Sequence, residues 1–111
     1  MTNKENIIST IKRYKPEFSK LGIENIGLFG SYLRDEQSEK SDIDLLIDFI
    51  PGNENFDNYM AAYDLFENIF QNIRVEIVTK NGLDKYIGPK ILKEVFYVYG
   101  SNRVFKSMFA D

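Results

Sequence analysis

The sequence contains neither cysteine nor histidine. Without cysteine the chain can form no disulfide bond, no thiolate zinc site and no cysteine nucleophile. Without histidine it can form no Ser-His-Asp triad and no HExxH metalloprotease site, and it has no imidazole to exchange protons near neutral pH. Any chemistry that this chain performs must therefore depend on carboxylates.

The chain also lacks a cluster of basic residues and a long apolar run. Its net charge is −3, and its Lys and Arg residues form no block that could neutralise several phosphates, so we expect no direct binding to nucleic acid. No apolar stretch is long enough to span a membrane, and the N-terminus lacks the apolar block of a signal peptide. We therefore expect a cytoplasmic protein that does not contact a membrane.

The length of 111 residues suits one domain that buries a core without disulfides or structural metal. Leu, Ile, Val and Phe make up about a third of the chain, well above the level at which disorder becomes the default. We therefore predict a single domain over residues 1–111. Residues 101–111 show no clear period and receive no assignment.

Helical and extended patterns alternate along the first part of the chain. Apolar residues recur at helical spacing over residues 3–21, where Pro16 predicts a kink or two short helices. Residues 23–29 have the composition of a short strand. Ser31 is placed to cap a helical turn over residues 32–37.

The strongest strand pattern covers residues 42–50, and its apolar content favours a central position in a sheet. A second amphipathic helix is predicted over residues 59–72, and a third strand over residues 73–79. Residues 83–87 and 90–97 read as two further helical pieces. Together these patterns predict an α/β fold with a small sheet flanked by helices.

The first candidate for a functional site is the pair Gly30 and Ser31, where a strand meets a helical turn. Free backbone N–H groups at a helix start attract anions, Gly30 lets a phosphate oxygen approach the backbone, and the Ser31 hydroxyl can donate to it. The pair therefore favours phosphate binding. A tight turn with a capping serine explains the same residues, and is the commoner case for such a step taken alone.

The second candidate is Asp42-Ile43-Asp44, in which the two carboxylates point to the same face of a strand. Neighbouring carboxylates repel each other, and a divalent cation between them is the easiest explanation of their closeness. Two-metal phosphoryl-transfer sites use carboxylates in this way. A solvated junction between loop and strand is the alternative, and it is favoured when the motif is considered alone.

Glu76 is a third carboxylate, inside the predicted strand of residues 73–79. Val75 and Ile77 face the other way, so Glu76 is an acidic residue in a strand that otherwise looks buried. It is a candidate ligand of a second metal ion, or a general base that deprotonates an attacking hydroxyl. A salt bridge across the sheet, for example with Arg34 or a lysine, explains Glu76 equally well.

Residues 26–49, IGLFGSYLRDEQSEKSDIDLLIDF, resemble the signature of the minimal nucleotidyltransferase family within the polymerase-β-like superfamily. That signature is a hydrophobic strand, Gly-Ser, an Arg three residues after the Ser, and an Asp-x-Asp about ten residues further on. The similarity continues to Tyr99 and so covers nearly all of the chain.

The resemblance implies an αβαβαβα domain with a mixed sheet. Members of the family often act as antitoxins encoded beside a HEPN-domain toxin, and active members transfer AMP from ATP to a tyrosine of that toxin. The resemblance assigns Asp42 and Asp44 to Mg²⁺, Gly30 and Ser31 to the triphosphate of ATP, and Arg34 to a supporting role. With Glu76 as a further candidate ligand, we expect two Mg²⁺ ions.

Two departures from the family pattern bear on activity. The family usually has Asp where this chain has Glu76, so the carboxylate reaches one methylene further. It usually has Ala and Gly on either side of the arginine, where Leu33 and Asp35 add bulk and negative charge near the phosphate site. The alternative hypothesis is therefore a module of the same fold that neutralises a partner protein by binding, without catalysis.

Overall fold

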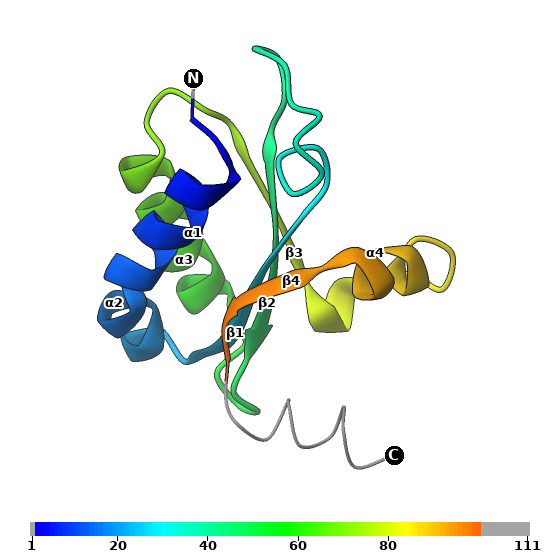
Figure 1. Cartoon of the computed structure of the whole chain (residues 1–111). Helices are drawn as coiled ribbons and strands as arrows, with labels where there is room; N and C mark the ends of the chain where they lie inside the picture. Colours follow the sequence, from blue (N-terminus) through cyan, green and yellow to red (C-terminus); the bar gives the residue numbers. More distant parts are fainter. Residues whose placement is uncertain (1, 101–111) are drawn as a thin grey trace.

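Four strands form one mixed sheet in the order β3-β2-β1-β4 (Figure 1). The computed structural model describes residues 2–100. β1 runs antiparallel to both β2 and β4, whereas β2 and β3 are parallel. The mixed sheet and the central position predicted for the second strand are therefore confirmed. The strands are β1 Ile23–Phe29, β2 Ile43–Phe49, β3 Val75–Thr79 and β4 Phe96–Tyr99.

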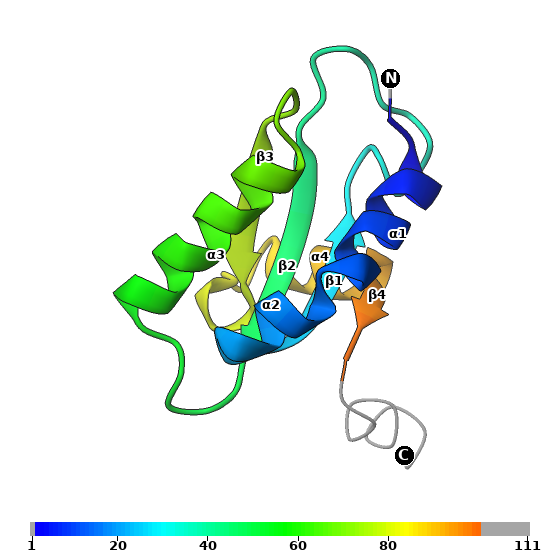
Figure 2. The same cartoon turned by 90° about the vertical axis from the view of Figure 1, so that its left-hand side faces the viewer.

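The helices cover the two faces of the sheet unequally (Figures 1 and 2). α1 (Lys4–Arg13), α2 (Lys15–Lys20) and α3 (Phe56–Ile69) lie against one face. The 3₁₀ helix η1 (Lys80–Gly82) and the short α4 (Gly88–Glu94) lie on the opposite side. Within the described residues, one face is thus closed by three helices, while the other carries short segments.

The core lies between the sheet and its three-helix layer. The rings of Phe18 and Phe66 stack there with their centroids 4.6 Å apart. Leu45 and Ile47 of β2 are fully buried, and each such side chain contributes roughly 1.5–3 kcal/mol to folding. This burial explains the strong strand pattern of residues 42–50. No helix in the described part of the chain is long and apolar enough to cross a membrane.

The two N-terminal helices confirm the effect predicted for Pro16. α1 ends at Arg13 and α2 begins at Lys15, so Pro16 lies in the first turn of α2. Proline is accepted there because that turn needs no backbone N–H from it. The first strand also has the bounds predicted from the sequence.

The helix predicted over residues 90–97 is wrong at its C-terminal end. α4 ends at Glu94, and Val95, with φ −58° and ψ 136°, leads the chain into β4. Tyr97 and Tyr99 then pair with β1. Aromatic and β-branched residues pack well on a sheet, and β1 would otherwise present an unpaired edge. The implied order αβαβαβα is therefore corrected to one whose last described element is a strand.

The helical piece predicted over residues 83–87 is also wrong. The Asp84 side chain accepts hydrogen bonds from the backbone N–H groups of Tyr86 and Ile87 at 2.8 and 2.6 Å, which forms a turn before α4. Gly88 begins α4 rather than separating two helices, and Pro89 follows it in the first turn.

The helical turn predicted over residues 32–37 is shorter than expected. The Arg34 N–H donates to the Gly30 carbonyl at 3.2 Å, but no helix follows. Asp35 has a left-handed φ of +58°, which ends a right-handed helical path. Ser31 therefore caps no helix, and the residues predicted to bind phosphate lie on a single turn.

Candidate active site

Gly30 directly follows β1 and has a φ of +80°. A Cβ added at this position would overlap the Oδ2 atom of Asp44. Both the left-handed backbone and this close approach require glycine. The turn after β1 is therefore held directly against the second carboxylate of the Asp-x-Asp motif.

Asp44 lies on β2, which is flanked by β1 and β3 in the sheet. In the sheet it pairs with Phe29 of β1 on one side and with Glu76 of β3 on the other. Asp44 and Glu76, two of the three candidate carboxylates, thus lie side by side on neighbouring strands, and Asp44 lies against the Gly30 turn.

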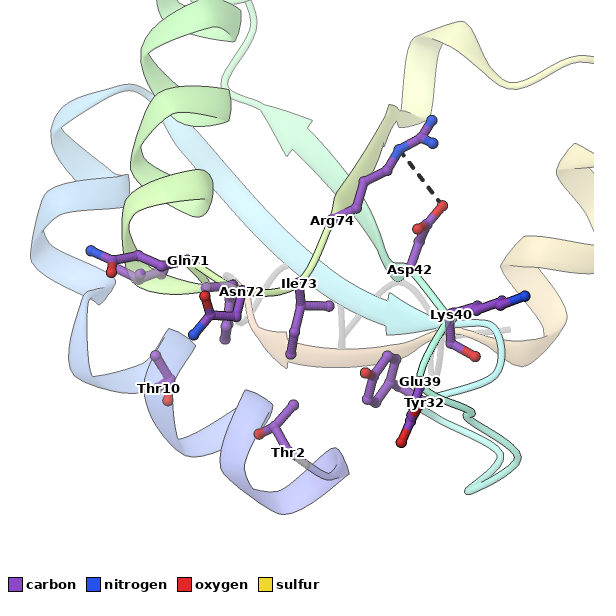
Figure 3. A pocket seen from close by; sticks show the side chains of 13 residues that line it. Thr2, Thr10, Tyr32, Glu39, Lys40, Asp42, Gln71, Asn72, Ile73 and Arg74 are labelled. Carbon is purple, nitrogen blue, oxygen red and sulfur yellow. Dashed lines mark ion pairs between the residues drawn. The ribbon is translucent and has the colours of Figure 1, made fainter.

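Asp42 precedes β2, and its side chain is directed toward Arg74 (Figure 3). The Asp42 Oδ2 and Arg74 Nε atoms are 3.8 Å apart. The Arg74 side chain is 77% exposed, so this ion pair contributes little to stability. Asp42 can therefore turn toward a cation at small energetic cost.

Val75 and Ile77 are buried in the core, as the alternation along the strand predicts, whereas Glu76 itself is exposed. β3 is an edge strand of the sheet, and the Glu76 carboxylate is open to solvent. The alternative of a salt bridge is not supported. Within residues 2–100, Arg34 pairs with Glu36 and Glu94, and no lysine or arginine pairs with Glu76.

The half-buried Asp44 carboxyl is surrounded mainly by negative charge. Its pKa is raised to about 6, first by burial and then by the charges of Glu76 and Asp42, while Arg34 acts in the opposite direction. The negative charges that act on Asp44 are thus not balanced by the guanidinium that acts against them. A divalent cation would restore that balance.

Ionisation of Asp44 should make stability depend on pH when no divalent cation is present. The folded pKa of about 6 exceeds the reference value of 3.8, so its contribution is fully present below pH 3.8 and is lost as the pH rises through 6. Discounted for solvent screening, the loss is about 1 kcal/mol, or roughly 5 °C in Tm.

Asp44→Asn in EDTA is therefore expected to melt several degrees above the unsubstituted chain at pH 7.5, and the difference should shrink toward pH 4. Thermal melts over this pH range measure it. A difference that is constant with pH, or that grows as the pH falls, would contradict the assignment of the charged cluster.

The carboxylates of this site suit a metal ion that binds together with the phosphates of its substrate. Among residues 2–100, no three acidic side chains are arranged to hold a metal ion by themselves. Mg²⁺ is usually bound by one or two carboxylates together with substrate phosphates and water. Asp42 and Asp44 supply such a pair, and the unbalanced charge around Asp44 favours a cation beside it.

Glu94 is a residue of this site that the sequence patterns missed. Its Oε2 atom accepts a hydrogen bond from the Gly30 N–H at 3.1 Å, and its Oε1 atom pairs with Arg34. The contact joins positions 64 residues apart. No local motif marks such a residue, because only the position of α4 beside the turn after β1 brings it there.

A cavity of about 480 Å³ contains most of the predicted site. Ser31 does not line it, although it follows Gly30 directly and its carbonyl accepts the Glu36 N–H at 2.9 Å. Apolar side chains of β3 and of the segment that follows it also line the cavity, which therefore offers both charged and apolar surface. The predicted site residues that line it are Gly30, Arg34, Asp44 and Glu76, whereas Asp42 does not, and the apolar residues include Val78, Leu83, Ile87 and Ile91.

A larger cavity of about 720 Å³ lies beside α1, the loop before β2 and the segment between α3 and β3 (Figure 3). Asp42 is on its border, but Gly30, Asp44 and Glu76 are not among its lining residues. Size alone would favour this cavity. The convergence of charged groups instead places the candidate active site in the smaller one.

The residues that differ from the family pattern beside Arg34 do not enter the smaller cavity. The Asp35 carboxylate pairs with Lys4 at 3.3 Å. Leu33 is partly buried and packs against the core. The added bulk and charge are thus accommodated away from the predicted phosphate site.

Comparison with known proteins shows the family of this chain. The family model described as polymerase beta nucleotidyltransferase matches residues 5–104. The chain belongs to this family. A curated relative, the protein adenylyltransferase MntA of Thermococcus cleftensis, is 36% identical over 101 residues, which cover 88% of this chain and 98% of the relative. The polymerase beta nucleotidyltransferase fold and enzyme class predicted from the motifs are therefore confirmed.

Solved structures agree with this fold. A chain proposed to be a minimal nucleotidyltransferase superposes with a TM-score of 0.74 at 25% identity, covering 86% of this chain and 95% of that one. An MNT antitoxin in complex with a tri-AMPylated HEPN toxin of Shewanella oneidensis gives a TM-score of 0.57 at 14% identity, covering 86% and 76%. At this low sequence identity, the similarity to the MNT antitoxin complex shows only that the fold is shared.

Proposed function

We propose that this nucleotidyltransferase is a single-domain, cytoplasmic protein adenylyltransferase that moves AMP from ATP to a tyrosine hydroxyl of a partner protein. The observation that carries the proposal is the meeting of Gly30, Asp44 and Glu76 at one cavity. The name of the Thermococcus relative supports ATP as donor and a protein as acceptor. The AMPylated HEPN toxin complex supports such a toxin as partner, with this chain as antitoxin.

Asp42 and Asp44 would hold Mg²⁺, with Glu76 as a further carboxylate ligand. When bound, the metal neutralises the triphosphate and polarises the phosphoryl oxygens. A triphosphate beside three carboxylates is otherwise repelled, so ATP is expected to bind with Mg²⁺ rather than alone. The Ser31 hydroxyl and the Arg34 guanidinium are the groups that would donate to its phosphate oxygens.

In the transfer, the tyrosine oxygen forms a bond to the α-phosphorus of ATP. The bond from that phosphorus to the oxygen bridging to the β-phosphate breaks, and pyrophosphate leaves. Glu76 takes the proton of the tyrosine hydroxyl. Such catalysis relies on positioning and charge stabilisation, without a covalent enzyme intermediate.

Glu76→Gln is expected to lower kcat for AMP transfer by about 100-fold, the lower end of the range for loss of a general base. Glu76→Asp, which restores the residue usual in the family, should keep most of the activity. Glu17→Gln, an exposed charge change on α2 away from this cavity, is the control. Equal activities of the Glu76→Gln and Glu17→Gln variants would remove Glu76 from the proposed mechanism.

The second candidate function is a binding module that neutralises its partner without catalysis. The exposure of Glu76 and the absence of a three-carboxylate metal group within residues 2–100 favour it. The fold would then be retained for complex formation alone.

One assay separates the two functions. The chain is incubated with its co-encoded neighbouring protein, Mg²⁺ and ATP, and the intact mass of the neighbour is measured. A gain of one or more AMP units that requires Mg²⁺ supports the adenylyltransferase. A stable complex with no mass change, formed equally well in EDTA, supports the binding module.

A further inference from the structure

The Glu94 carboxylate contacts Gly30 and Arg34, two predicted residues of the site that lie on the turn after β1. One oxygen accepts the Gly30 N–H at 3.1 Å, and the other pairs with the Arg34 guanidinium. Glu94 comes from α4 and lines the same cavity as Asp44. It therefore links the end of α4 to the beginning of the predicted phosphate site.

Glu94 is more sheltered than the other carboxylate that contacts Arg34. The Glu94 side chain is 27% exposed and the Glu36 side chain 65%. Burial alone would raise the pKa of Glu94, but hydrogen bonds from Arg34 and Gly30 hold it below its ordinary value. The carboxylate is therefore ionised near neutral pH, and its contact with Arg34 is the less screened of the two.

The hydrogen bonds that Arg34 makes within the protein leave some of its N–H groups able to donate to a ligand. Its Nε–H donates to Glu36 at 2.8 Å and its Nη1 to Glu94, whereas a guanidinium carries five N–H donors. Phosphate can therefore bind Arg34 while Glu94 still holds it. A guanidinium fixed on one side loses less freedom when it binds a phosphate on the other.

We propose that Glu94 is a positioning residue that fixes Arg34 beside the Gly30 turn in the arrangement that receives the triphosphate. The proposal rests on the proposed function, because it assumes that Mg²⁺ and ATP occupy this cavity. It assigns Glu94 no contact with the reacting atoms. Its effect on nucleotide binding should therefore pass through Arg34.

Glu94→Gln tests this link selectively. The glutamine carbonyl can still accept the Gly30 N–H, but the charge that pairs with Arg34 is lost. Affinity is measured by titration with Mg²⁺ and an ATP analogue whose α–β bridging oxygen is replaced by methylene, without an acceptor protein. We expect Glu94→Gln to weaken binding about 10- to 100-fold, and Glu36→Gln, the matched change on the same guanidinium, less than about threefold.

The decisive measurement is a double-mutant cycle with Arg34→Ala. If Glu94 acts through Arg34, Glu94→Gln should weaken binding by less than about threefold when Arg34 is already alanine. Independent, multiplying effects of the two substitutions would overturn the proposal. Equal effects of Glu94→Gln and Glu36→Gln, or tighter binding by Glu94→Gln, would overturn it as well.

Two further measurements distinguish failure of this proposal from unfolding of the variant and from failure of the proposed function. Thermal melts report whether Glu94→Gln stays folded, and if it does not, Glu94→Asp replaces it, since the shorter side chain cannot reach both partners. A chain that binds the analogue with the expected coupling but transfers no AMP refutes only the proposed function. A chain that binds no nucleotide refutes both.

Discussion

Asp44→Asn is expected to lower kcat/KM for AMP transfer by about 100- to 1,000-fold, because Asp44 is the carboxylate that meets both Gly30 and Glu76. Loss of a metal ligand removes several kcal/mol of charge stabilisation, and each 1.36 kcal/mol is a factor of about ten in rate. The measurement is the rate of AMP incorporation into the partner protein at saturating Mg²⁺.

Asp48→Asn is the matched control for this substitution. Asp48 lies on the same strand, but its carboxylate accepts a hydrogen bond from the Asn25 side chain at 3.1 Å and does not line the smaller cavity. It should keep at least half of the activity. Thermal melts of Asp44→Asn, which is expected to exceed the unsubstituted chain in stability in EDTA at pH 7.5, check that unfolding does not cause its loss of activity. Retention of more than a tenth of the activity by Asp44→Asn would argue against Asp44 as a metal ligand.

Gly30→Ala should produce the second large effect. An alanine would hold the same left-handed backbone at a cost of about 1–2 kcal/mol, and its Cβ would overlap the Asp44 carboxylate. Either the turn or Asp44 must move, and a displacement of about 1 Å at a catalytic group can lower activity 100-fold. We expect a Tm lowered by at least 5 °C and a loss of transfer of about 100-fold.

Gly52→Ala separates the two causes. Gly52 also has a left-handed backbone, with φ +90°, but a Cβ there would meet no atom within 4 Å. Gly52→Ala should therefore show the backbone contribution to stability and keep full activity. If Gly30→Ala behaved like Gly52→Ala in both stability and activity, the close approach of the Gly30 turn to Asp44 would have no functional role.

The parts of the fold that were predicted correctly depend on local patterns. The bounds of β1 follow from a run of apolar and β-branched residues between Gly22 and Gly30, and Pro16 marked the division between α1 and α2. The burial of Val75 and Ile77 on the face opposite Glu76 was also predicted. Alternation along a strand fixes which side chains share a face.

The errors concern features that depend on contacts distant in the sequence. β4 follows α4 almost directly. Tyr97 and Tyr99 adopt an extended conformation because they pair with the edge of β1. The exposure of Glu76 depends on β3 being an edge strand, which its composition does not reveal. Glu94 belongs to the site only because α4 reaches the turn after β1.

One boundary could have been predicted better. α3 begins at Phe56, three residues before the predicted start at Tyr59, and the Asn55 side chain accepts a hydrogen bond from the Asn58 N–H at 2.8 Å. Asparagine is among the preferred N-cap residues. The sequence therefore contained a signal for the start of α3 at Asn55. The prediction began later because it relied on the periodic apolar residues, which start at Tyr59.

The central claim is that Mg²⁺ and ATP bind where Gly30, Asp44 and Glu76 meet. A crystal structure with Mg²⁺ and the α–β methylene analogue of ATP tests it most directly. We predict Mg²⁺ at about 2.0–2.1 Å from carboxylate oxygens of Asp42 and Asp44, with the phosphates beside Ser31 and Arg34. A nucleotide bound in the larger cavity beside α1, or a metal ion that does not contact Asp44, would contradict this account.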